Sequence, residues 1–339
     1  MNISFRTRQR IKRGGLVALI VIAILSLLFV LWFIWLGRFV VYTRDGGAKF
    51  DMTLTDDFSQ GQKAKEPEKN PVKIYYDEGE NALNAGTDLA QMVGYYADEE
   101  ALREGADTVL SQVKNLPTST PILLDVKTAK GAFLYSSAVS TKRDSGINTA
   151  AMDQLITYLA DNRYYAIARL PALRDYEYGL NHVSDGLPTA GGYLWADDDY
   201  CYWLNPASQG TITYLISIVT ELKSLGFDEV VFGDFCFPDT EEIVFDGDKN
   251  EALANAAKTL LTACATESFA VSFVGQDATF PLPEGRSRLY LLGTNAAQAE
   301  ALAIQSGLEN PAVNLVFLTE IHDTRFDAYS VLRPLAAAH

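Results

Sequence analysis

The stretch "GFDEVVFGDFCFPDT", residues 226–240, combines a helix-ending glycine, an apolar strand and a turn. Gly226 suits the position just after a helix, where glycine readily adopts the required positive φ. Residues 229–235 are almost entirely apolar, which is typical of a strand buried on both faces. Gly233 and Asp234 stand side by side at the exit of this strand. The stretch therefore predicts a buried parallel strand whose end either delivers an acid to a site or has lost one.

Similar strands alternate with amphipathic helices on both sides of this stretch. Asn148, Ser208 and Asp248 are suited to cap three of the helices. The alternation predicts a parallel sheet covered by helices, either an open doubly wound sheet or a (β/α)₈ TIM-like barrel. The number of strands and the length of the region after position 90 favour the barrel, although a short last strand leaves its closure open. The expected strands are 92–97, 122–127 with a hairpin arm at 132–137, 164–170, 229–235, 269–275, 288–294, 312–320 and 328–334.

The N-terminal region predicts a membrane anchor. Residues 14–37 are 24 positions without a charge, which as a helix span about 36 Å at about 1.5 Å per residue. A cleaved signal peptide would have a shorter apolar part and a small-residue cleavage site, which "LWFIWLGRFVVYTR" lacks. Five basic residues before the span place the N-terminus in the cytoplasm. We therefore expect a cytoplasmic tail (1–13), a transmembrane helix (14–37), a flexible linker (38–70) and an extracellular barrel domain (71–339) at the plasma membrane.

The charge of the chain limits its partners. Residues 1–44 hold seven basic residues and no acid, so residues 45–339 carry 21 basic residues against all 43 acids, a net charge of −22. Such a surface disfavours nucleic acid and anionic lipid headgroups. It suits neutral or cationic partners, and equally it serves solubility alone.

Cofactor chemistry has little support in the sequence. Cys201, Cys236 and Cys264 form neither a disulfide framework nor a zinc spacing, although one disulfide is compatible with their number. Three histidines leave little for a His-rich metal site, and there is no phosphate-binding loop, dinucleotide fingerprint or nucleophile elbow. We expect no cofactor and no metal.

Polar and aromatic side chains follow the expected strands. Acids, one or two arginines and exposed aromatics facing one barrel mouth suit sugar rings, because aromatic faces stack on sugar C–H faces and carboxylates bind hydroxyls. The competing interpretation is structural, since Asp at a strand end often caps a turn and Trp in a long loop often anchors that loop. The candidates are Asp125, Lys127, Arg169, Asp175, Asp234 and Glu320 at strand exits, and Trp195, Trp203 and Asn205 in the loop 191–206.

Four ordered segments resemble one known family. They are "LLDVKTAKGAFLYSS", "YYAIARLPALRD", "GGYLWADDDYCYWLNP" and "GFDEVVFGDFCFP", which together cover about 120–240. They are similar to segments of a glycoside-hydrolase-like domain family of unknown function whose barrel is distantly similar to alpha-amylase-type barrels. The resemblance implies a TIM-like barrel and a carbohydrate substrate class.

The departures from this family fall where its chemistry is expected. The family pattern at 226–238 has Gln, Asp and Arg where this chain has Val231, Gly233 and Cys236. Because strand side chains alternate, Gly233 and Asp234 face opposite sides, and Asp234 can replace the family Asp only through a bulge or register slip. In the next strand the family pattern has an Asp before Phe-Gly, whereas "VSFVG" offers Phe273 and Val274.

Three functions remain open. The favoured one is a catalytically degenerate, membrane-anchored barrel that binds cell-wall or surface polysaccharide, because a glycosidase needs a pair of carboxylates. The alternatives are an active hydrolase with relocated acids, and a scaffolding ectodomain whose protein partners are unspecified. The catalytic candidates, if the barrel is active, are Asp234, Glu320 and Asp125. The substrate-binding candidates are Lys127, Arg169, Asp175, Trp195, Trp203 and Asn205.

Overall fold

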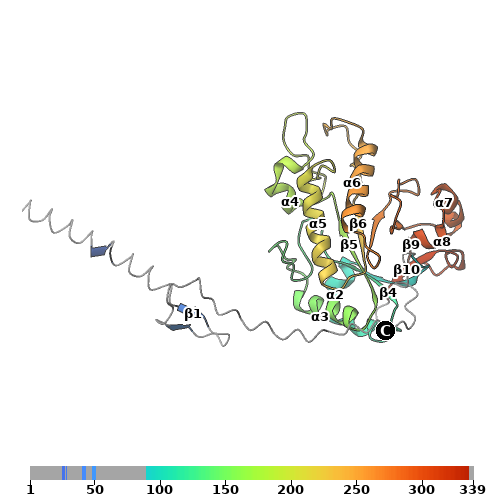
Figure 1. Ribbon diagram of the computed structural model, residues 1–339, viewed down its shortest axis with the longest axis horizontal. Helices are drawn as coiled ribbons and strands as arrows, with labels where there is room; N and C mark the ends of the chain where they lie inside the picture. Colours follow the sequence, from blue (N-terminus) through green and yellow to red (C-terminus); the bar gives the residue numbers. More distant parts are fainter. Residues whose placement is uncertain (1–24, 27, 29–39, 43–47, 51–88, 336–339) are drawn as a thin grey trace, which may run out of the picture. The chain divides into compact units, whose positions relative to one another are not determined.

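The computed structural model describes residues 25, 26, 28, 40–42, 48–50 and 89–335 (Figure 1). The chain divides into two compact units, Met1–Asp77 and Glu78–His339. In the first unit, β1 (Val40–Tyr42) pairs with β2 (Ala48–Phe50) in antiparallel fashion, inside the predicted linker. The predicted tail, almost all of the span 14–37 and most of the linker lie outside the described residues. Within the described ranges, no helix combines the length and apolar character needed to cross a bilayer.

Among residues 89–335, eight parallel strands close into a barrel in the order β10-β3-β4-β5-β6-β7-β8-β9. The pairing of β10 with β3, which aligns Val331 with Val93, completes the ring. The expectation of a (β/α)₈ TIM-like barrel is confirmed, and the short last strand closes it. The strands are β3 (Val93–Ala97), β4 (Pro121–Asp125), β5 (Tyr165–Pro171), β6 (Glu229–Gly233), β7 (Ala270–Val274), β8 (Leu289–Leu292), β9 (Leu315–Leu318) and β10 (Ser330–Pro334).

Helices follow the strands on the outside of the barrel (Figure 1). The predicted caps are confirmed, since the Asn148, Ser208 and Asp248 side chains accept hydrogen bonds from Ala151, Gly210 and Glu251 N–H groups. Gly226 follows α5 with φ +91° and so ends that helix as expected. The helices are α2 (Glu99–Val113), α3 (Thr149–Asp161), α4 (Tyr176–Asn181), α5 (Gln209–Ser224), α6 (Lys249–Cys264), α7 (Ala299–Gln305) and α8 (Pro311–Asn314), with short 3₁₀ turns η2 (Val183–Asp185), η3 (Ala296–Gln298) and η4 (Thr324–Phe326).

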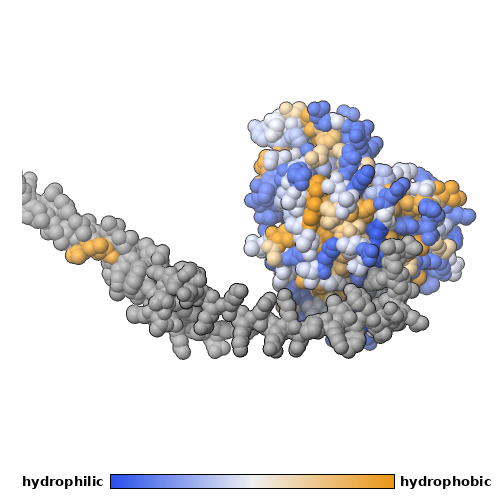
Figure 2. All heavy atoms as spheres, in the orientation of Figure 1, coloured by the Kyte–Doolittle hydropathy of each residue, from blue (hydrophilic) through white to orange (hydrophobic). Residues whose placement is uncertain are grey.

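The apolar core has two layers. Val230 and Phe232 of β6 point outward into a large cluster between the strands and helices, whereas Val231 points into the barrel with Leu123 and Ile167. By the same alternation, Gly233 faces the barrel interior at its mouth. On the face that Figure 2 shows, hydrophilic side chains surround a band and several patches of apolar ones.

A buried polar network fills the barrel interior near the N-terminal ends of its strands. The Glu229 carboxylate pairs with the Arg288 guanidinium, and both side chains are fully buried. Tyr165 and Tyr290 donate to this carboxylate at 2.8 Å each, and the Ser272 hydroxyl donates at 2.5 Å. Burial and then the Glu229 charge raise the pKa of both tyrosines, so both stay protonated donors. Every carboxylate oxygen in this network therefore has a partner.

Several element bounds differ from the sequence expectations. The strand expected at 229–235 ends at Gly233, and the one expected at 312–320 begins at Leu315 because α8 occupies its start. The hairpin arm consists of an antiparallel bridge between Lys127 and Phe133 rather than a full strand. All three cysteines are free.

Candidate functional site

Two adjoining hollows lie at the C-terminal ends of the strands, and we call them together the mouth. The first, of about 430 Å³, is bounded by the ends of β3, β5, β8 and β9. The second, of about 280 Å³, is bounded by the ends of β4 to β8. Arg169 and Leu292 line both hollows. In TIM barrels this end carries the functional site, so the mouth is the first place to examine.

An Asp125–Arg169 ion pair stands between the hollows. The two residues are neighbours in the β4–β5 register, which brings their side chains together at the strand ends. Arg169 donates Nε–H to Oδ1 at 2.6 Å and Nη2–H to Oδ2 at 2.9 Å, and the Glu99 N–H adds a bond to Oδ2 at 2.8 Å. Burial alone would lower the pKa of Arg169, but the hydrogen bonds and charge of Asp125 raise it overall. This forked pair fixes the orientation of both side chains, and both oxygens of Asp125 already accept hydrogen bonds.

Lys127 and Asp175 form a second pair, which is completely buried. Their Nζ–Oδ2 distance is 2.7 Å, and neither side chain has exposed surface. Asp175 also caps α4 through the Tyr178 N–H and accepts from the Tyr214 hydroxyl. Lys127 borders the second hollow, whereas Asp175 borders neither hollow. The structure thus gives Asp175 a stabilising set of contacts, and its substrate-binding role stays a prediction.

Asp234 reaches the second hollow from a turn rather than from a strand. Its φ is +47°, in the left-handed region that Asp tolerates better than most residues. Within residues 89–335 its carboxyl forms neither a hydrogen bond nor a salt bridge. Burial raises the pKa of Asp234, and the nearby charges of Arg174 and Lys127 oppose this only in part. Asp234 is therefore a half-buried, unpaired carboxyl, the kind of group that can hold and transfer a proton.

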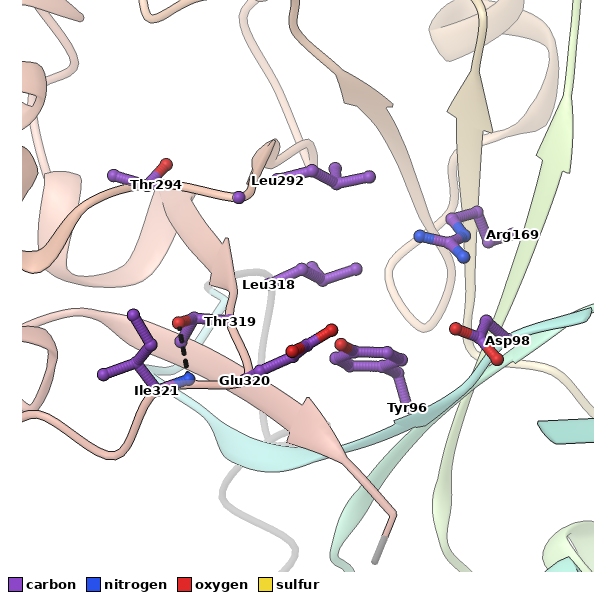
Figure 3. A pocket seen from close by; sticks show the side chains of 10 residues that line it. Tyr96, Asp98, Arg169, Leu292, Thr294, Leu318, Thr319, Glu320 and Ile321 are labelled. Carbon is purple, nitrogen blue, oxygen red and sulfur yellow. Dashed lines mark hydrogen bonds between the residues drawn. The ribbon is translucent and has the colours of Figure 1, made fainter. Parts of the chain in front are cut away.

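Glu320 occupies the first hollow together with two residues of the β3 end (Figure 3). Its exposed carboxyl is directed toward Tyr96, while Asp98 and Arg169 lie on the other side of the Tyr96 ring. Burial raises the pKa of Tyr96, and the charges of Glu320 and Asp98 raise it further. Asp98 is partly engaged, because it caps α2 through the Ala101 N–H. Glu320 itself has no hydrogen bond or salt bridge within the described residues.

The loop 191–206 does not bring its predicted residues to the mouth. The Trp203 indole is buried against the core and donates to Asp197 at 3.0 Å. Trp195 donates to Glu242 at 2.7 Å, and the Asn205 side chain accepts from the Ala207 N–H within a turn. None of the three borders either hollow. Their predicted substrate-binding role stays untested, but these contacts match the structural interpretation of the same residues.

Sequence reasoning missed the contribution of β3 to the mouth. Tyr96 is the last residue but one of β3, which ends at Ala97, and Asp98 follows Ala97 directly. The signal was available, because "YYADEE" places an aromatic residue and acids at a strand exit as the later strands do. The four segments that resemble the family begin near residue 120, after this strand exit.

A larger groove of about 830 Å³ lies outside the barrel, bordered by α4, α5 and the loop near 140. Its aromatic residues offer little free surface, since the Tyr178 ring is stacked between His182 and Tyr214 at centroid distances of 4.1 and 4.0 Å. Among the described residues, no three His, Cys, Asp or Glu side chains are arranged to hold a metal ion. The mouth remains the better candidate for a functional site.

Residues 95–274, more than half of the chain, match a family described as "Putative glycosyl hydrolase domain". This region runs from β3 to β7 and includes the Asp125–Arg169 pair and Asp234. No curated protein matches the chain.

Solved structures share the fold at low sequence identity. An alpha-galactosidase from Lactobacillus brevis aligns with 74% of this chain and 38% of its own, at 10% identity and a TM-score of 0.51. An inactive mutant of an exo beta-N-acetylglucosaminidase from Vibrio harveyi aligns with 72% of this chain and 50% of its own, at 8% identity and a TM-score of 0.50. This chain thus spans half or less of those two enzymes. A hypothetical protein from Ruminiclostridium thermocellum aligns over 53% of this chain and 96% of its own, at 21% identity and a TM-score of 0.43.

Proposed function

The chain belongs to the glycosyl hydrolase-like family that matches residues 95–274, and from that premise we propose that its barrel binds polysaccharide at the mouth without hydrolysing it. The membership supports a carbohydrate ligand but does not fix activity, because one fold hosts many functions. The proposal therefore depends on the chemistry of the mouth.

The observation that carries the proposal is what the β6 and β7 ends present to the interior. Val231 and Val274 pack with the interior cluster, and Gly233 follows Val231 on the same face, so no inward position within β6 or β7 at the mouth carries a carboxylate; Asp234 reaches the second hollow only from the turn after β6. Glycoside hydrolysis needs two carboxyl groups about 5–5.5 Å apart for retention or about 6.5–9.5 Å apart for inversion. Asp125 does not supply one of them as it stands, because Arg169 and the Glu99 N–H occupy both of its oxygens.

The same groups suit the binding of a sugar. The Asp125–Arg169 pair presents a fixed polar surface at which sugar hydroxyls can donate and accept hydrogen bonds. Tyr96 and the exposed Leu292 add apolar surface beside it, against which a sugar C–H face packs favourably. Because the ion pair is already formed, little ordering of the site is needed when a ligand arrives.

Retention of the full chain on insoluble wall polysaccharide tests this function. We expect the unchanged chain to be retained and no reducing sugar to be released. Arg169→Gln removes the fork to Asp125 and should lose retention. The matched control Arg163→Gln, at an exposed position before β5, should keep it. No retention on any wall polysaccharide would contradict the proposal and favour a scaffolding role.

A second candidate, an active hydrolase, is favoured by Asp234. Its raised pKa would let it act as general acid, with Glu320 as the second carboxylate. Release of reducing sugar that is lost in both Asp234→Asn and Glu320→Gln would establish this alternative. Absence of release over a broad panel of glycans would exclude it for that panel.

The place of action that we propose is the outer face of the plasma membrane. The uncharged stretch 14–37 would anchor the chain, and the five basic residues before it would keep the N-terminus in the cytoplasm. This arrangement would place the barrel beside cell-wall or surface polysaccharide. Protease treatment of intact cells should degrade the barrel, whereas protection of the barrel would contradict this topology.

A further inference from the structure

The formal charges at the mouth are strongly unequal. Five carboxylates and two cations line its hollows, and the cations are Lys127 and Arg169. Each cation is already bound to a carboxylate, Lys127 to Asp175 at 2.7 Å and Arg169 to Asp125 at 2.6 Å. No cation among these lining residues is therefore left to receive an anionic sugar.

The carboxylates are not equally engaged. Asp125 is held by Arg169, Asp98 caps α2, and Glu99 pairs with Arg103 at 2.6 Å. Asp234 and Glu320 are the two lining acids with no hydrogen bond or salt bridge in residues 89–335. One stands in each hollow, so a ligand that extends across the mouth meets a carboxyl group at both ends. Neither carboxyl has a direct partner among residues 89–335, although the charges of Arg174 and Lys127 act on Asp234 from nearby.

The surroundings make these charges more effective than they would be in open water. Asp234, in the second hollow, is half-buried, and Tyr96, Leu292 and Leu318 contribute apolar surface to the wall of the first hollow. Charges beside low-dielectric walls are screened less than charges at an open surface. A neutral glycan would offer these carboxylates hydroxyl donors but no opposite charge, and a uronate or phosphate would be repelled by them.

We propose that the mouth selects glycans that carry free, protonated amino groups, that is, de-N-acetylated hexosamine units, over neutral or anionic ones. The inference rests on the proposed function, because it names the ligand class of the same site. An ammonium group has three donors and matches a carboxylate acceptor. The acetamido form of the same sugar has no charge and adds bulk, so acetylation of the ligand should weaken its binding.

Calorimetric titration of the full chain with a soluble glucosamine oligomer and with its N-acetylated counterpart tests the inference. We expect the amino form to bind about tenfold more tightly, as one well-placed charge interaction near a surface can provide. Raising the salt concentration should reduce this preference. Asp234→Asn and Glu320→Gln should each lower it, whereas the exposed controls Asp239→Asn and Glu309→Gln should not.

A variant that adds a carboxylate to the mouth also tests the preference for amino sugars, because the added charge should strengthen it. A Cβ at Gly233 would meet the Leu170 carbonyl oxygen at 3.6 Å and a Val274 methyl at 4.0 Å, so a side chain fits there and would point into the mouth. Gly233→Asp should strengthen binding of the amino oligomer by a few-fold, while the isosteric neutral Gly233→Asn should not. Binding of the N-acetylated oligomer to both variants reports whether they fold.

The outcomes separate the two proposals. Equal affinity for both oligomers, or no response to the charge variants, would overturn the amine preference while leaving glycan binding in place. Binding of neither oligomer, together with no retention on wall polysaccharide, would remove the binding function and the preference with it.

Discussion

The two ends of the barrel each hold an arginine–carboxylate pair in different surroundings. At the N-terminal end, Glu229 and Arg288 are fully buried, and tyrosine and serine hydroxyls complete the hydrogen bonding of the carboxylate. At the mouth, Asp125 and Arg169 keep 13% and 17% of their side-chain surface exposed. The carboxyls of Asp234 and Glu320 nearby form neither a hydrogen bond nor a salt bridge with any residue of 89–335. The N-terminal end is buried and both charged groups of its ion pair are hydrogen-bonded, whereas the mouth is open and its Asp234 and Glu320 carboxyls can contact a ligand.

We therefore expect the N-terminal end to contribute mainly to stability and the mouth to contribute mainly to ligand binding. Removing one partner of a buried ion pair leaves an uncompensated charge in a low-dielectric interior. Removing a group at an open mouth changes what the site can hold, because water can solvate the remaining partner. In TIM barrels generally, functional residues lie at the C-terminal face, and residues at the N-terminal face stabilise the fold.

Glu229→Gln should cause the largest loss of stability. The change leaves the Arg288 guanidinium without its buried counter-ion, and breaking such a pair costs about 3–5 kcal/mol. Urea denaturation of the variant and of the exposed control Glu309→Gln measures the difference. A loss below about 1 kcal/mol, the level of an exposed pair, would mean that the network does not hold this end of the barrel together.

Asp125→Asn should be less costly to the fold. Its pair with Arg169 is partly exposed, so we expect a loss of about 1–2 kcal/mol, between the values for surface and buried pairs. The same denaturation experiment checks it. A loss equal to that of Glu229→Gln would contradict the contrast between the two ends.

Trp203→Phe should lower stability modestly and leave glycan binding unchanged. The change removes the hydrogen bond from the indole to Asp197 while keeping an aromatic ring in the core. A net loss of about 1 kcal/mol is typical of one hydrogen bond. If glycan affinity fell as well, the sequence-based assignment of this residue to substrate binding would regain support.

Asp234→Asn should have the smallest effect on stability. At neutral pH we expect it to make the folded protein slightly more stable. Because burial raises the pKa of Asp234 in the folded state, the native carboxyl binds its proton more tightly than the unfolded one. Stability linked to this group is thus present below the unfolded pKa and is lost as the pH rises through the folded pKa. The thermal midpoint of the variant should exceed that of the unchanged chain at pH 7 and converge with it at low pH. The opposite order at pH 7 would show that the ionised carboxyl has a stabilising partner.

The sequence predicted the barrel well because the decisive signals are local. Apolar strands, helix caps such as Asn148, and the glycine after α5 each follow from a few neighbouring residues. Strand alternation predicted that Val231 and Gly233 share one face, and the structure shows that this face is the inner one. Closure of the ring by β10 depended on a pairing between the two ends of the domain, which no short segment specifies.

The candidate site was predicted only in part, because partners in space decide its chemistry. Asp125, Arg169, Asp234 and Glu320 do line one mouth, as their positions at strand exits suggested. Asp175 stands at a similar exit but turns away to pair with Lys127. The sequence could not distinguish Asp175 from the acids that line the mouth, because a carboxylate in an ion pair and one without a partner are the same residue type.

Whether the mouth binds the ligand while the opposite end maintains the fold can be tested by comparing two variants. Calorimetric titration of the folded full chain would measure glycan affinity in Asp125→Asn and in Glu229→Gln. We predict that Asp125→Asn loses at least about tenfold in affinity, since it removes a charge-assisted hydrogen-bonding surface. Glu229→Gln, measured at a temperature where it is folded, should keep the affinity of the unchanged chain. Unchanged affinity in Asp125→Asn, or an equal loss in both variants, would contradict the claim that the mouth binds the ligand while the opposite end maintains the fold.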